Sequence, residues 1–90
     1  MIQQFVDDDA GYFAWLGQHP AGFVLKTYRE PTPGYVRLHR ATCYSVTRPP
    51  ANGSSWTHDY RKTCADTRAE LEAWARGEVL LPKSCAKCNP

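Results

Sequence analysis

Four cysteines and one histidine are the residues of this 90-residue chain whose types and spacing could form a chemical site. Cys85 and Cys88 form a Cys-x2-Cys pair, and the others are His39, Cys43 and Cys64. Thiolates and imidazole nitrogens are the ligands that zinc prefers, and four of them complete a tetrahedral shell with no open position. The sequence therefore predicts one structural Zn²⁺ per chain.

The spacing leaves two possible ligand sets. The first consists of the four cysteines Cys43, Cys64, Cys85 and Cys88, with His39 as the alternative ligand. In an extended chain, at about 3.3 Å per residue, His39 lies about 13 Å from Cys43, too far to share an ion. If a turn begins at Ala41, the two side chains face each other as i, i+4 neighbours. His39 then completes the site and Cys64 is left as a buried thiol.

Some interpretations of the cysteines need no metal. They can be buried reduced thiols, or form a disulfide after oxidation. A redox pair of the thioredoxin kind is disfavoured, because it stands at a helix N-terminus after a strand, whereas residues 85–88 lie at the end of this chain. Residues 7–9 are all Asp and interrupt the place of a signal-peptide apolar core. We therefore expect a cytoplasmic protein, in which reduced cysteines favour metal binding over disulfides.

The elements that must position these residues follow from the hydrophobic pattern and the turn residues. Thr67-Arg-Ala-Glu70 has the form of a capping box, which marks the start of a helix. Alternating β-formers on either side of a Pro- and Gly-rich turn at residues 30–34 predict a hairpin. The expected elements are helices over 8–17 and 67–76 and strands over 22–29, 35–40 and 56–63.

This order predicts an α+β fold in which a three-stranded antiparallel sheet carries two helices, as α-β-β-β-α. Ninety residues fit one domain, with the Cys-x2-Cys tail at 83–90. A chain this short buries a small core, so a zinc ion is expected to act as a staple.

The charge is unevenly distributed along the chain. The net charge is +2, but residues 1–20 hold three acids and no Lys or Arg, while residues 21–90 hold all eleven bases. Bases interleaved with aromatic residues are typical of nucleic-acid contact, because cations meet phosphates and rings stack on bases. The predicted nucleic-acid-binding surface consists of Tyr35, Arg37, His39, Arg40, Arg48, Trp56, Arg61 and Lys62.

Two other classes of function are compatible with the sequence. Trp56 follows a Gly-Ser-Ser segment and is a candidate anchor for a protein partner, which would make the chain a regulatory or interaction module. A small enzyme using a His39–Cys43 pair is a further alternative. We expect no catalysis, because no nucleophile elbow, P-loop or HExxH motif is present. We expect no membrane partner, because no apolar run approaches the roughly 18 residues of a membrane span.

Overall fold

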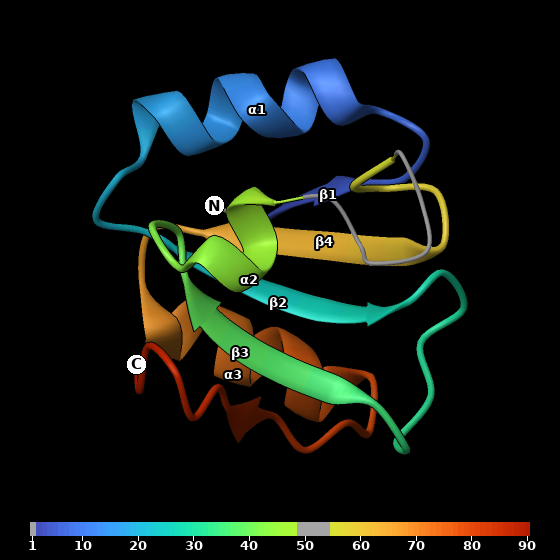
Figure 1. The fold of residues 1–90 in the computed structure, drawn as a ribbon. Coiled ribbons are helices and arrows are strands. Elements are labelled where there is room, and N and C mark those ends of the chain that lie inside the picture. Colours follow the sequence, from blue (N-terminus) through green and yellow to red (C-terminus); the bar gives the residue numbers. More distant parts are fainter. Residues whose placement is uncertain (1, 49–54) are drawn as a thin grey trace.

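The centre of the fold is an antiparallel hairpin whose second strand leads into the cysteine-bearing segments. The computed structural model describes residues 2–48 and 55–90 (Figure 1). The helices are α1 (Asp9–Gln18), α2 (Tyr44–Thr47) and α3 (Arg68–Gly77). The strands are β1 (Gln3–Phe5), β2 (Phe23–Tyr28), β3 (Val36–Arg40), β4 (Tyr60–Ala65) and β5 (Lys83–Ser84).

The described strands form one five-stranded mixed sheet in the order β1-β4-β2-β3-β5. All neighbours are antiparallel except β3 and β5, which pair in parallel. The predicted α+β class is confirmed, but the prediction of a three-stranded antiparallel sheet with two helices is wrong. Two edge strands of three and two residues and a helix of four residues were missed. Elements this short contain too few residues to show a hydrophobic period.

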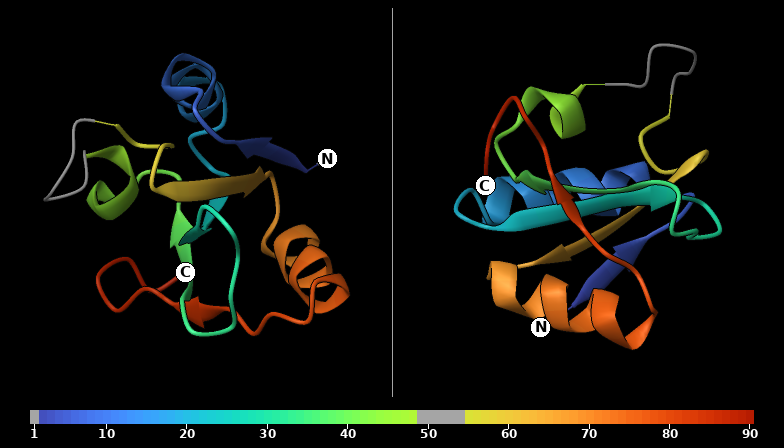
Figure 2. Two further views of the ribbon diagram at one scale, coloured as in Figure 1. Left: turned by 90° about the vertical axis from the view of Figure 1, so that its right-hand side faces the viewer. Right: turned by 90° about the horizontal axis from the view of Figure 1, so that it is seen from below.

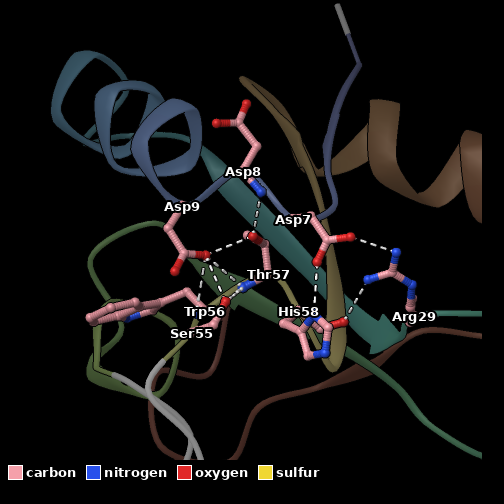
Figure 3. A network of polar contacts seen from close by, with 8 residues as sticks. All are labelled: Asp7, Asp8, Asp9, Arg29, Ser55, Trp56, Thr57 and His58. Atoms are coloured by element: carbon pink, nitrogen blue, oxygen red, sulfur yellow. Dashed lines mark hydrogen bonds and ion pairs between the residues drawn. The ribbon is translucent and has the colours of Figure 1, made fainter.

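The third predicted strand, over 56–63, is displaced to Tyr60–Ala65. The carboxylate of Asp9 explains the shift, since it accepts hydrogen bonds from the backbone N–H groups of Trp56 and Thr57 and from the Thr57 hydroxyl (Figure 3). Residues 55–57 are thus tied to the start of α1 and do not pair in the sheet. Nearby, Asp7 binds His58 and Arg29, and these neighbours hold the pKa of its carboxyl far below the ordinary range.

Helices cover both faces of the sheet, with α1 on one side and α3 on the other (Figures 1 and 2). Successive side chains of a strand point to opposite faces, so Val24 packs with α1 and α2, whereas Leu25 packs with α3. The α1-side core contains Phe5, Tyr12, Trp15, Val24, Ala41, Cys43, Val46, Cys64 and Cys85. The α3-side core contains Leu25, Val36, Leu38, Ala65, Leu71, Ala75 and Leu80.

The predicted helix boundaries are close to those observed. The helix expected over 8–17 is α1, and the one expected over 67–76 is α3. No helix within 2–48 or 55–90 combines the length and apolar character needed to cross a bilayer.

The predicted capping box begins α3 and gives a direct stability test. The Thr67 hydroxyl accepts a hydrogen bond from the Glu70 backbone N–H at 3.3 Å. We expect Thr67→Ala to lower the free energy of unfolding by about 1 kcal/mol, the usual value of an N-cap. Urea denaturation measures the change, and Thr67→Ser is the matched control because it keeps the hydroxyl. Equal losses for both variants would contradict a capping role.

Candidate metal centre

His39, Cys43, Cys85 and Cys88 come together at one end of β3. One ligand atom from each, a ring nitrogen or a sulfur, lies within 4.8 Å of all the others. The sulfurs of Cys43 and Cys85 are 4.0 Å apart. Ligands about 2.3 Å from a tetrahedral zinc ion lie roughly 3.8 Å from one another. The cluster therefore has the dimensions of a tetrahedral metal site.

The first two residues of the cluster are positioned by the turn that follows β3. The chain turns at residues 41–42, and the Cys43 N–H donates to the Arg40 carbonyl at 3.0 Å. Cys43 is the N-cap of α2, and the ring of His39 lies on the sheet face that α2 covers. This turn brings two residues four positions apart to one point, as the alternative ligand set requires.

The other two residues reach the cluster through β5. Lys83 and Ser84 pair with β3, and the Cys85 N–H extends the pairing by donating to the Leu38 carbonyl at 2.8 Å. A turn follows, closed by a bond from the Asn89 N–H to the Cys85 carbonyl. The C-terminal segment therefore runs alongside β3 and returns toward α2 (Figure 2).

His39 is suited to bind a metal through a neutral ring. Its side chain is buried, at 4% exposure, and neither ring nitrogen has a hydrogen-bond partner among the described residues. Burial lowers the pKa of the imidazole to about 4, and the charges of Lys26, Lys62 and Arg37 act in the same direction. An unpaired buried polar group costs about 1–3 kcal/mol. A metal ion bound to one nitrogen would satisfy that atom, and the neutral imidazole is the ligand form.

The thiols of the C-terminal pair have opposite tendencies to ionise. Burial raises the pKa of Cys85, but backbone N–H bonds from Cys88 and Lys87 outweigh burial and lower it overall. Burial and the neighbouring thiols Cys43 and Cys85 raise the pKa of Cys88 to about 11, although the Arg40 N–H donates to its sulfur at 3.3 Å. Adjacent thiolates repel one another, so a bound cation is needed to hold all of them ionised.

Cys64 stands apart from this cluster. It lies on β4, is fully buried in the α1-side core, and pairs in register with Gln3 and Val24. Burial raises the pKa of its thiol well above the usual value. The fold thus brings together the alternative ligand set with His39, and the four-cysteine set is not assembled. The signal in the sequence was the i, i+4 spacing of His39 and Cys43.

Several side chains of the predicted nucleic-acid-binding surface are buried or partly buried in the structure. His39 belongs to the cluster, and Lys62 is only 2% exposed, with its ammonium group bonded to the Trp56 carbonyl. The Trp56 ring is half-buried and packs edge-on against Phe13 at 4.4 Å. His39 and Lys62 are therefore not available as an exposed contact surface. The packing against Phe13 leaves only part of the Trp56 side chain exposed for nucleic acid or for a protein partner.

The predicted arginines are dispersed over the molecule. Arg40 donates to the carbonyls of Cys88 and Asn89, and Arg61 donates to Gln4 and to the Arg29 carbonyl. Arg48 lies over the ring of Tyr44. Arg37 alone lies next to Tyr35, with its guanidinium carbon 5.0 Å from the ring centroid.

Three cations stand side by side on the sheet face that α1 and α2 partly cover. Lys26 on β2 pairs in register with Arg37 on β3 and with Lys62 on β4. The tyrosines at the same end are Tyr28, Tyr35 and Tyr60, with ring centroids 5.0–6.0 Å apart. We call these six residues the cation–tyrosine row.

Lys26, Tyr28 and Tyr60 were absent from the predicted surface. The alternation along each strand assigns them to one face, but only the pairing of β2 with β4 makes them neighbours. The Lys26 ammonium lies 4.2 Å from the Tyr60 ring centroid, and burial lowers its pKa.

The chain was compared with family models, with curated proteins and with solved structures, and no match was found in any of the three. The metal cluster and the cation–tyrosine row are therefore the two features of the described residues that bear on function.

Proposed function

We propose that His39, Cys43, Cys85 and Cys88 bind one structural zinc ion. Three sulfurs and one nitrogen form a donor set that zinc favours. Four protein ligands fill a tetrahedral shell, which leaves no position for water or a substrate. The metal would thus tie the end of β3, the start of α2 and the C-terminal segment together. In this proposal the zinc takes no part in catalysis.

We further propose that the domain binds single-stranded nucleic acid through the cation–tyrosine row. Lys26 and Arg37 are its partly exposed cations, and the buried Lys62 makes no direct contact in this proposal. The observation that carries this proposal is the placement of Lys26 and Arg37 among three closely spaced tyrosine rings. Tyr28 is 48% exposed, so a base can reach one face of this ring system. Lysine and arginine neutralise the phosphates of a strand, and tyrosine rings stack on unpaired bases.

Binding of a fluorescein-labelled single strand of roughly twelve nucleotides tests this function. Fluorescence anisotropy should show affinity that falls with salt, with a logarithmic slope of about −0.7 for each phosphate contact. Tyr28→Ala should weaken binding by roughly 1–3 kcal/mol, the cost of one lost stacking contact.

Tyr28→Phe is the matched control, because it keeps the ring and should retain the affinity. A duplex of the same sequence should bind more weakly, since its bases are already stacked. An affinity that does not depend on salt, or that is unchanged in Tyr28→Ala, would exclude the proposed surface.

A further inference from the structure

A pocket of about 390 Å³ opens directly beside the metal centre. Its floor is formed by β2 and β3, through Lys26, Arg37 and His39, with Tyr35 immediately before β3. Its other walls come from α2 and from the C-terminal segment, which contributes Lys83 and Lys87. The pocket thus contains part of the cation–tyrosine row and shares His39 and Cys85 with the metal ligands.

The pocket carries an unbalanced positive charge. Four of the ten described residues that line it are cations, namely Lys26, Arg37, Lys83 and Lys87, and none is Asp or Glu. Within the described ranges, no ion pair joins these four side chains to a carboxylate. A zinc ion held by three thiolates and a neutral imidazole would carry a net charge of about −1, which does not balance four cations. Like charges that converge with too little counter-charge raise the free energy of a site. A multiply charged anion would lower it.

The size of the pocket limits the kind of anion. Small-molecule sites range from roughly 300 to 1,000 Å³, so this pocket fits a ligand of the size of one nucleotide. A phosphate monoester carries a charge of about −1.5 to −2 at neutral pH, which exceeds the single charge of a phosphodiester within a strand. Four cations therefore match a terminal phosphate better than an internal one. The Tyr35 ring supplies an aromatic face on the same wall.

The C-terminal wall of this pocket includes Cys85, one of the candidate metal ligands. Lys83 and Lys87 stand two residues before and two residues after Cys85, and β5 is only two residues long. A metal bound by Cys85 and Cys88 would fix this segment against β3 and hold both lysines at the pocket. Anion binding and metal retention are therefore expected to be linked.

We propose that this pocket binds the phosphate monoester of a nucleotide, at the end of a nucleic-acid strand or in a free nucleotide, against a wall held by the zinc ion. The strand-end form of the proposal rests on the proposed function, whereas the free-nucleotide form does not. Arg37, Lys83 and Lys87 bind the phosphate, and Tyr35 contacts the base or sugar.

The test uses the zinc-loaded protein and one single-stranded oligonucleotide in three forms, with a phosphate on the 5′ end, on the 3′ end, or on neither. We expect one phosphorylated form to bind at least about tenfold more tightly than the unphosphorylated strand. One or two charge-assisted hydrogen bonds to the terminal phosphate would supply this difference in affinity. The double variant Lys83→Ala/Lys87→Ala should abolish this difference. Both side chains are exposed, so the variant should fold. Arg76→Ala, which removes an exposed cation on α3, is the matched control and should keep the difference.

A second measurement monitors the release of zinc from the protein. A nucleoside monophosphate should slow the release of zinc to a chromogenic chelator several-fold in the wild-type protein and not in the double variant. Adenosine and inorganic phosphate, tested alone, separate the contribution of the base and sugar from that of the phosphate.

The outcomes distinguish the two proposals. If the oligonucleotide binds equally well in all three forms and the monophosphate does not slow zinc release, the pocket proposal is overturned and the nucleic-acid function stands. If no strand binds but the monophosphate binds and protects the zinc, the strand-binding function fails and the pocket takes free nucleotides. If neither strands nor the monophosphate bind, both proposals are overturned.

Discussion

Removal of the proposed zinc ion is expected to lower the stability of this domain strongly. Without the metal, three thiols and the unpaired ring of His39 remain packed at one point. The C-terminal segment beyond β5 would then depend on a few hydrogen bonds, such as those from Arg40 to the Cys88 and Asn89 carbonyls. Structural zinc sites contribute about 10–16 kcal/mol of apparent binding free energy in small domains, and a protein of this size has on the order of 5–15 kcal/mol of total stability. Chelation should therefore cost on the order of 5 kcal/mol or more, measured by circular dichroism during urea denaturation.

Two variants determine which residues bind the metal. Cys88→Ser should reduce the zinc content, measured by elemental analysis, from one ion per chain to well below one. Cys64→Ala removes a sulfur that lies outside the cluster, so it should retain one zinc per chain while losing core stability. The ligand set would be wrong if Cys64→Ala lost the zinc and His39→Ala kept it.

The sequence was sufficient to predict the parts of the fold that have a clear local signal. The capping box at Thr67 and the alternation on either side of the 30–34 turn predicted α3 and the hairpin close to their observed bounds. The strand β5 has no such signal, since Lys83 and Ser84 are polar and exposed. They join the sheet by pairing in parallel with Arg37 and Leu38 of β3, a tertiary contact that has no local signal in the sequence.

The candidate site, too, could be predicted only in part from the sequence. The residue types pointed to a metal site, with Cys64 as the first choice for the fourth ligand and His39 as the alternative. Only the turn at residues 41–42 brings His39 and Cys43 together. The burial of Lys62 also depends on tertiary structure, because β4 pairs with both β1 and β2 in the sheet. A sequence pattern alone presents this lysine as a surface cation. Its burial instead makes it a source of instability.

Replacement of Lys62 by methionine is expected to stabilise the protein at neutral pH. The side chain is 2% exposed. Burial, followed by the charge of Lys26, lowers the pKa of its ammonium group from the ordinary value of 10.5 to about 8, although Cys64 and Asp9 act in the opposite direction. A tenfold difference in proton affinity between the folded and unfolded chain corresponds to about 1.4 kcal/mol. After allowance for the lost hydrogen bond to the Trp56 carbonyl, Lys62→Met should raise the free energy of unfolding by about 1–3 kcal/mol at pH 7.

The contribution of Lys62 to the free energy of unfolding depends on pH with a definite sign. Between about pH 8 and pH 10.5 the unfolded chain holds a proton on Lys62 that the folded protein has released. The contribution of Lys62 to stability therefore increases as the pH rises through this window, and its full penalty applies below about pH 8. The advantage of Lys62→Met over the wild type should shrink between pH 8 and 10.5, as measured by urea denaturation of the zinc-loaded proteins. Titration of Cys64 affects both proteins, so the difference between them isolates Lys62.

Lys83→Met is the matched control for this measurement, because the same substitution is made at an exposed position on β5. It should change the free energy of unfolding by no more than about 0.5 kcal/mol across the whole pH range. A loss of stability in Lys62→Met at pH 7 would mean that the ammonium group has a favourable partner that outweighs its burial. In that case Lys62 would be a structural cation, and the positive charge on this sheet face would contribute to folding as well as to anion binding.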